Sequence, residues 1–269
     1  MTEKMQNVFK RRDIVWAACI IVVFIVVLSN ARAEEIQKLN MAQLYINSLG
    51  MKFVPIPNTN IMMSVYETRV RDYAAYAREN SGVYEEWKDP ISGFSQSEDH
   101  PVLCVSWEDA QAFCKWLTQK EKHKGIQYRL PTDHEWSMAV GIGDRERASD
   151  SPAHKNAKIK GVYVWGAAWP PPQGAGNYSQ AIENDTDVYE YTAPVGKFKS
   201  NRYGLYDMGG NVREWCQDLY TSNTDKRVLR GGSYGNRSPD ALLASCRGKE
   251  QPSERDDNYG FRCVIQTLE

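Results

Sequence analysis

The chain has 269 residues and a formal net charge of −1 at pH 7. This length suffices for one large domain or two small ones with a proper core. Residues 1–33 hold five Lys or Arg and two Asp or Glu, so the remainder carries 28 basic and 32 acidic residues, a net charge of −4. No basic patch stands out, which argues against nucleic acid as the partner.

The N-terminal segment has the features of an export signal. Lys10, Arg11 and Arg12 precede an apolar run of 15 residues (14–28), and residues 31–33 offer the small side chains that a signal peptidase uses. The run is short for a bilayer-spanning helix, which needs about 20 residues. We therefore expect either a cleaved signal peptide or a retained apolar helix that anchors the chain.

Both alternatives export the rest of the chain, to a periplasm or to the outer face of the cytoplasmic membrane. Residues 1–33 would be the signal peptide or anchor, and the polar, amphipathic stretch 34–50 would be a linker. The folded domain would then comprise residues 51–269.

The first elements of this domain follow from side-chain periodicity. Residues 51–56 alternate as a strand does. Residues 70–79 are predicted to form a helix, with Tyr73 and Tyr76 on one side.

Two further helices have clear start signals. Ser106 can cap a helix whose apolar side chains recur at spacings of three and four as far as Leu117. Thr132 and Glu135 form a capping box, in which each side chain accepts a hydrogen bond from the backbone amide of the other residue.

Beyond Gly141 the sequence changes character. Residues 144–160 are predicted to form a charged loop, and from Val162 onward short runs are broken by Gly, Pro and Asn. Long irregular loops within a globular domain need something to hold them, and disulfides and metal ions are the usual means.

Export permits disulfides. Cys19 lies in the apolar run, and five cysteines remain: Cys104, Cys114, Cys216, Cys246 and Cys263. The odd number leaves one thiol unpaired or paired with another chain. No two cysteines have the C-x-x-C spacing of a zinc or thioredoxin-like site.

Five segments, taken together, point to one family. They are residues 101–110 (PVLCVSWEDA), 129–136 (RLPTDHEW), 204–215 (GLYDMGGNVREW), 230–234 (RGGSY) and 260–262 (GFR). In this order and spacing they resemble the formylglycine-generating enzyme, or sulfatase-modifying factor, family. The resemblance implies an α+β fold, a loop-rich variant of the C-type lectin fold, preceded here by the N-terminal apolar helix.

The resemblance also implies two calcium sites. Carried over by position, the first site comprises Asn177, Tyr178, Asp187 and Tyr189, and the second comprises Asp207, Gly210, Val212 and Glu214. The two tyrosines, the glycine and the valine would contribute backbone oxygens. Calcium takes carboxylate, amide and backbone oxygens in irregular geometry, so these residue types suit the ion. The alternative is a helix cap at Asn211 with solvated acidic residues around it.

A disulfide between Cys114 and Cys263 is a further implication of the resemblance. Cys216 with Cys246 would be a second pair, and Cys104 would be the odd thiol. The apolar neighbours of Cys104 indicate burial rather than reactivity.

The chain departs from the family at the residues that carry out oxidation. Family oxidases use two cysteines, shortly after the Gly-Gly-Ser-Tyr motif, to bind copper(I), a soft ion that prefers thiolates. The matching positions here are Asn236 and Ala241, and no cysteine occurs from residue 217 to 245. We therefore expect no copper, no formylglycine-generating oxidase activity and no assigned catalytic residue.

The function that we expect is binding or scaffolding by a non-oxidising domain. Its partner would be a protein segment, a glycan or a subunit of a membrane complex, held in loops on a rigid base. The candidate pocket residues near the Gly-Gly-Ser motif are Trp165, Arg213, Arg230, Ser233, Tyr234, Asn236, Arg237 and Arg247. Two alternatives stand beside this interpretation: Arg213 and Arg230 could only brace loops, and the chain could be an enzyme of altered chemistry that modifies an exported protein or metabolite.

Overall fold

The computed structural model describes residues 43–180, 182 and 189–268. They fall within one unit, residues 40–269. The predicted signal peptide or anchor and the apolar run lie outside the described residues. Within the described part, no helix is long and apolar enough to cross a membrane.

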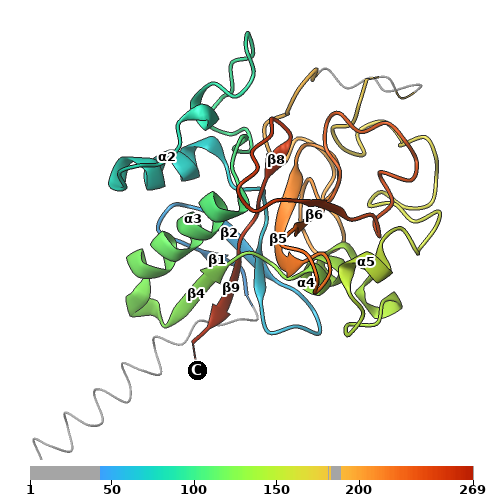
Figure 1. The fold of residues 1–269 in the computed structure, drawn as a ribbon, viewed down its shortest axis with the longest axis horizontal. Coiled ribbons are helices and arrows are strands. Elements are labelled where there is room, and N and C mark those ends of the chain that lie inside the picture. The colour runs from blue at the N-terminus through green and yellow to red at the C-terminus, as the bar shows by residue number, and fades with distance from the viewer. Residues whose placement is uncertain (1–42, 181, 183–188, 269) are drawn as a thin grey trace, which may run out of the picture. The chain divides into compact units, whose positions relative to one another are not determined.

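One antiparallel sheet contains the predicted strand at residues 51–56 (Figure 1). Its strands, in spatial order, are β1 (Tyr45–Ile46), β2 (Lys52–Pro55), β3 (Met62–Ser64), β9 (Val264–Thr267) and β4 (Ile126–Arg129). The last strand of the chain thus lies between two early ones. Because β1 pairs with β2, with Tyr45 opposite Phe53, the sheet begins inside the range predicted to be a linker.

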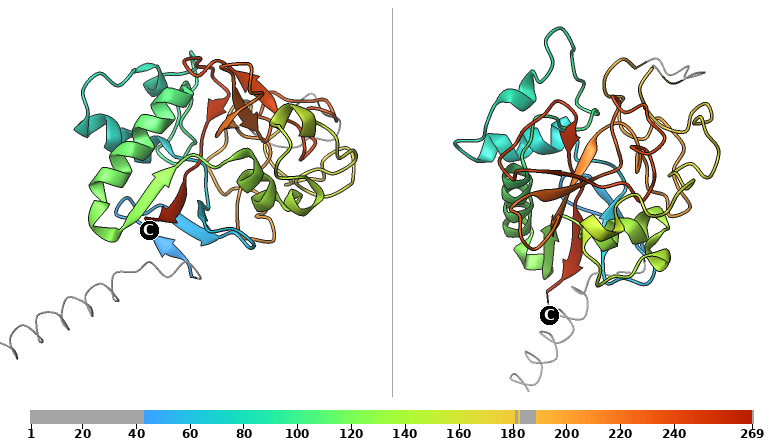
Figure 2. Two further views of the ribbon diagram at one scale, coloured as in Figure 1. Left: turned by 60° about the horizontal axis from the view of Figure 1, so that its bottom comes forward. Right: turned by 45° about the vertical axis from the view of Figure 1, so that its right-hand side comes forward.

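The predicted helices are confirmed with their caps. They are α2 (Val70–Glu79), α3 (Trp107–Lys120) and α4 (Asp133–Val140), and Figure 2 shows α3 lying along β4. Ser106 Oγ accepts from the Asp109 amide at 3.1 Å, and Thr132 Oγ1 accepts from the Glu135 amide at 3.1 Å. Short 3-10 turns occur at Glu86–Lys88, Lys122–Lys124 and Gly143–Arg145.

The prediction of a loop over residues 144–160 is wrong in one part. A short helix, α5 (Pro152–Lys155), forms there. Its start is local, because Ser151 Oγ accepts from the His154 amide at 3.2 Å and proline occupies the first turn. Beyond it the described chain is irregular apart from strands, as predicted.

A second sheet carries most of the family motifs. Its order is β7 (Gly248–Glu250), β6 (Arg227–Arg230), β5 (Arg213–Leu219) and β8 (Tyr259–Gly260), with β5 and β8 parallel. Trp136 and Trp215 are fully buried beside it. Each indole finds a partner: Trp136 Nε1 donates to Glu214 Oε2 at 2.9 Å, and Trp215 Nε1 donates to the Val105 carbonyl at 2.9 Å. Buried aromatic anchors therefore hold irregular chain.

Glu121, which follows α3, ties the edge strand β1 to the rest of the domain. Its carboxylate accepts from the Ser48 amide at 2.6 Å and from the hydroxyls of Tyr45 at 2.9 Å and Tyr128 at 2.5 Å. Burial by itself raises the pKa of Glu121, but the hydrogen bonds from Ser48 and Tyr128 outweigh it and lower the pKa to about 2.

We expect Glu121→Gln to lower the free energy of unfolding near pH 7 by about 1–3 kcal/mol, the range for hydrogen bonds to a charged group. Because the folded pKa is depressed, this stabilisation is present above the ordinary value of 4.5 and is lost as the pH falls toward about 2. Urea unfolding of both proteins across that window measures the difference. The exposed Glu85 provides the control, since Glu85→Gln should change little. The expectation would be contradicted if the difference in free energy of unfolding between the parent and Glu121→Gln did not become smaller in acid.

Candidate functional site

A polar pocket of about 400 Å³ lies at the second sheet, around the Gly-Gly-Ser turn. Residues from β5, from the turn after β6, from β7 and from the approach to β8 converge there. The lining residues are Arg213, Leu229, Ser233, Gly235, Asn236, Gly248, Lys249, Asn258 and Tyr259. Arg213, Ser233 and Asn236 among the predicted pocket residues are thereby brought together.

The side chain of Asn236 organises the turn. Its Oδ1 accepts from the Ser233 amide at 3.0 Å and from Arg213 Nη2 at 3.0 Å. The Asn236 amide in turn donates to the Ser233 carbonyl at 3.0 Å. Gly232 allows the tight path, since its φ is +75° and an added Cβ would lie 2.8 Å from Leu242 Cδ2. The side-chain amide of Asn236 therefore holds both the loop and an arginine.

Both charged residues that line the pocket are basic. Arg213 and Lys249 form no ion pair within the part of the chain that the structure describes. The Lys249 ammonium lies 4.7 Å from the centre of the Tyr220 ring. The Tyr259 ring, which also lines the pocket, packs edge-on against Trp215 at 5.4 Å, and burial raises the pKa of the Tyr259 hydroxyl. The pocket is thus polar and positively charged.

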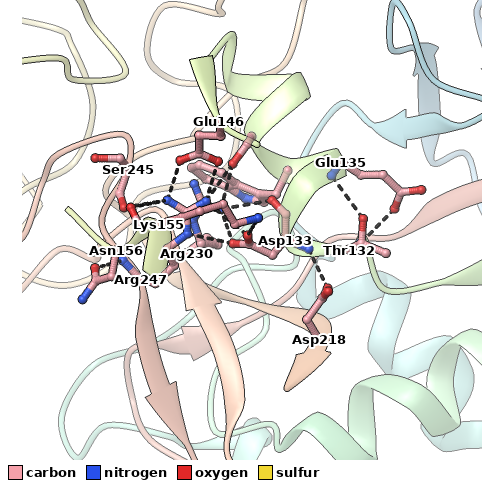
Figure 3. A network of polar contacts seen from close by, with 12 residues as sticks. Thr132, Asp133, Glu135, Glu146, Lys155, Asn156, Asp218, Arg230, Ser245 and Arg247 are labelled. Atoms are coloured by element: carbon pink, nitrogen blue, oxygen red, sulfur yellow. Dashed lines mark hydrogen bonds and ion pairs between the residues drawn. The ribbon is translucent and has the colours of Figure 1, made fainter. Parts of the chain in front are cut away.

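Arg230 and Arg247 do not line this pocket, which corrects the prediction. They are almost completely buried, and both form ion pairs with Asp133, the first residue of α4 (Figure 3). Asp133 Oδ1 lies 2.5 Å from Arg230 Nη1 and 2.9 Å from Arg247 Nε. Lys155 Nζ lies 2.6 Å from Asp133 Oδ2, and Arg247 Nη2 lies 2.6 Å from Glu146 Oε2.

This buried ion cluster nevertheless supports the pocket, because its two arginines directly precede segments that line it. Arg230 directly precedes the Gly-Gly-Ser turn, and Arg247 directly precedes Gly248, so the cluster anchors two walls of the pocket to α4. Burial by itself raises the pKa of Asp133, but Arg230 and Arg247 outweigh that effect and lower it. Nothing in the sequence marks Asp133 as the centre of the cluster, because its two arginine partners lie 97 and 114 residues away along the chain.

The remaining predicted pocket residues lie elsewhere. Trp165 lines a separate cavity of about 370 Å³ together with Asp207, and its ring stacks on Tyr163 at 4.7 Å. Tyr234 is partly buried against Tyr191, and Arg237 is exposed. The pocket around the Gly-Gly-Ser turn is thus lined by three of the eight predicted residues.

The first predicted calcium group contains one oxygen suited to a cation. Asn177 is fully buried, and its Nδ2 donates to the Tyr191 carbonyl at 2.7 Å. Its Oδ1 has no hydrogen-bond partner among the described residues. Tyr178 and Tyr189 are described, whereas Asp187 lies outside the described residues. A buried amide oxygen of this kind fits a hard cation such as calcium.

In the second predicted calcium group, the Glu214 carboxylate is bound by a buried arginine, Arg262. Arg262 Nε donates to Glu214 Oε2 at 2.8 Å and Arg262 Nη2 donates to Oε1 at 2.7 Å. Asp207 Oδ2 accepts from the Gly196 amide at 2.7 Å, and burial raises the pKa of Asp207 to about 6. Across the described residues, no three His, Cys, Asp or Glu side chains are grouped so that they could hold a metal ion. Calcium at this group remains a prediction, and an ion there would share Glu214 with Arg262.

Glu67 and Gly210 fix the backbone near these groups, and of the two only Glu67 carries no sequence signal of a role. Glu67, fully buried, accepts from Asn211 Nδ2 at 2.6 Å and from the Val212 amide at 3.2 Å. Gly210 packs so closely on the chain that an added Cβ would lie 2.3 Å from the Asn177 carbonyl oxygen. The backbone between the two predicted calcium groups is therefore held by a carboxylate and by a close approach that only glycine permits.

The five cysteines of the domain comprise a pair whose side chains are neighbours, a pair in separate clusters and a single buried thiol. The Sγ atoms of Cys114 and Cys263 lie 3.5 Å apart in the core, so the side chains of the first predicted pair are neighbours. Cys216 and Cys246 lie in different hydrophobic clusters. Cys104 is buried, as predicted, and burial raises the pKa of its thiol to about 12. We expect peptide mapping without reduction to recover a peptide that joins Cys114 to Cys263; recovery of both as free thiols would contradict this.

Comparisons with known proteins agree with the motifs. The chain is 33% identical over 192 residues to the inactive C-alpha-formylglycine-generating enzyme 2 of Bos taurus, covering 66% of this chain and 55% of the relative. It is 30% identical over 198 residues to the formylglycine-generating enzyme of Mus musculus, covering 66% and 48%. The chain thus spans about half the length of these curated relatives.

A solved structure and a family model complete the comparison. The structure of PvdO from Pseudomonas aeruginosa superimposes with a TM-score of 0.60 at 19% identity, covering 84% of this chain and 99% of that one, which shows a shared fold. The model of the sulfatase-modifying factor enzyme 1-like domain matches residues 32–267. The chain therefore belongs to the formylglycine-generating enzyme, or sulfatase-modifying factor, family.

Proposed function

We propose that this chain is an exported, non-oxidising member of its family, with a loop-rich variant of the C-type lectin fold, whose polar pocket binds a segment of a partner protein. One observation carries the proposal. Asn236, which the resemblance matches to a copper-binding cysteine of family oxidases, accepts hydrogen bonds from Arg213 and Ser233. An amide oxygen in this role offers neither a soft ligand nor a redox centre. It does support a preorganised polar surface for binding.

Further support comes from the sequence and from one relative. No cysteine occurs from residue 217 to 245, so a second soft ligand is missing from the segment in which the family places it. The bovine relative carries the word inactive in its name. The positively charged N-terminus and the apolar run at residues 14–28 support export, to a periplasm or to the outer membrane face where a membrane complex would be within reach.

The non-oxidising half of the proposal is tested with the purified full chain. Copper(I) is titrated in, and a Cys-x-Pro-x-Arg peptide is then incubated with the protein and analysed by mass spectrometry. We expect the peptide cysteine to remain unchanged. Formation of formylglycine would overturn this half.

The binding half is tested by crosslinking from the pocket in living cells. Gly235 lines the pocket, and the nearest heavy atom to a Cβ added there is Ser233 Oγ at 4.0 Å, so a photoreactive residue fits at this position. We expect a discrete crosslinked partner from position 235 and none from the exposed control position Lys122. Equal labelling from both positions, or from neither, would count against a binding pocket.

We also propose calcium at the group that contains Asn177, because its Oδ1 is buried without a partner among the described residues. Bound calcium should raise the thermal midpoint in proportion to its binding free energy, and EDTA should remove the increase. Asn177→Ala should abolish most of the calcium-dependent increase, whereas Asn223→Ala, on an exposed turn, should retain it. An increase of equal size in Asn177→Ala would contradict this site.

A further inference from the structure

We propose that the pocket selects a carboxylate, so that its partner presents an acidic segment. This inference rests on the proposed function and adds the chemical class of the ligand. The nine residues that line the pocket include two cations, Arg213 and Lys249, and no acidic residue. A protein ligand that enters such a pocket gains most from an anionic oxygen group.

Arg213 is held in place without being neutralised. Among the described residues, the hydrogen bond from its side chain runs from Nη2 to the neutral amide oxygen of Asn236 at 3.0 Å. A guanidinium carries five N–H donors in a planar fork that matches a carboxylate. Donors therefore remain for a ligand, and the positive charge has no counterion in the described part.

The neighbouring backbone also accommodates this arginine. A Cβ added to Gly248 would lie 2.8 Å from Arg213 Nη1, so the glycine leaves the space that the guanidinium occupies. Glycine at this position lets the guanidinium lie directly against β7. Contact with β7 and the Asn236 bond restrict the rotamers of Arg213, so that less entropy is lost when a ligand binds.

Acidic residues close to the pocket have other partners. Glu250, on β7, pairs with Lys226 at 3.1 Å. Asp257 accepts from Asn258 Nδ2 at 3.4 Å, and Asp256 Oδ1 accepts from the Asn258 amide at 3.2 Å. Among the described residues, none of these carboxylates forms an ion pair with Arg213 or Lys249.

The test compares two fluorescein-labelled nonapeptides, both amidated at the C-terminus. One has three central glutamates and the other has three central glutamines. Binding to the full chain in detergent micelles is followed by fluorescence anisotropy. We expect the glutamate peptide to bind about tenfold more tightly at low salt, and this preference to shrink when NaCl is raised to about 0.5 M.

Variants locate the effect in the pocket. Arg213→Gln should weaken binding of the glutamate peptide about tenfold, and Lys249→Gln should weaken it severalfold. Lys122→Gln, an exposed lysine outside the pocket, should leave it unchanged. Circular dichroism shows whether each variant is folded, and Arg213→Lys should restore part of the affinity, because it keeps the charge but not the fork.

The outcomes separate this inference from the proposed function. Equal binding of the two peptides, or a preference that survives Arg213→Gln in a folded protein, would overturn the carboxylate inference, while crosslinking from position 235 would still support segment binding. Failure of crosslinking combined with selective binding of the glutamate peptide would instead count against the proposed function. Binding of inorganic sulfate in competition assays, without binding of either peptide, would overturn the inference in favour of a sulfated glycan.

Discussion

Asp133→Asn should lower the free energy of unfolding by about 3–5 kcal/mol, the usual range when one partner of a buried ion pair is removed. Asp133 is fully buried, and three cations contact its carboxylate: Lys155, Arg230 and Arg247. Asparagine keeps the shape and loses the charge. The cations then remain out of water, and Glu146, which pairs with Arg247 at 2.6 Å, offsets the charge of one of them.

Urea unfolding followed by tryptophan fluorescence gives this difference. The matched control is Asp240→Asn, since Asp240 pairs with Lys160 on the surface with 77% of its side chain exposed. Exposed ion pairs contribute about 0–1 kcal/mol, so the control should unfold nearly as the parent does. If the two variants lost equal stability, the buried cluster would not be the support that the geometry indicates.

The same substitution should weaken the pocket as well as the fold. Arg230 and Arg247 connect α4 to the two chain segments that carry Ser233 and Gly248. At temperatures where Asp133→Asn is still folded, its affinity for the glutamate peptide should fall, although Asp133 does not line the pocket. Unchanged affinity would show that the pocket walls are held without the cluster.

Arg262→Met should lower the free energy of unfolding by a comparable amount, about 3–5 kcal/mol. Arg262 is fully buried and binds both oxygens of Glu214. It also donates to the backbone carbonyls of Ser64 at 3.1 Å and Tyr206 at 2.9 Å. Methionine leaves Glu214 without a counterion and leaves these carbonyls without their donor.

The stability lost in Arg262→Met should increase as the pH rises. Burial raises the pKa of Glu67 well above its ordinary value, and the charge of Arg262 opposes that rise. Without Arg262 the folded-state pKa of Glu67 rises further. A group whose folded pKa is raised loses stabilisation as the pH increases through that value, so Arg262→Met should be relatively less harmful in mild acid.

Unfolding measurements in EDTA from about pH 5 to about pH 8 test this dependence without a contribution from bound calcium. Arg71→Met is the control, because the Arg71 side chain is 43% exposed where it pairs with Asp99. Arg71→Met should change the free energy of unfolding little at any pH. A loss for Arg262→Met that is the same at both ends of the range would contradict the assigned role of Glu67.

Local features of this fold were predictable because their determinants lie close together along the chain. The helices after Ser106 and Thr132 begin where their capping boxes place them, and each box spans four residues. The strand at residues 51–56 follows from alternation. Family membership was equally accessible, since five motifs agree in order and spacing and the family model matches residues 32–267.

The sequence by itself determined the helices and the family, because each depends on residue identity at known spacings. Only the tertiary structure decided which polar residues meet. It buried Arg230 and Arg247 against Asp133, placed Arg213 and Lys249 in the lining of one pocket, and placed Trp165 in the lining of another cavity. Contacts between residues tens of positions apart depend on how loops close over the core, and no local pattern of side chains encodes that closure.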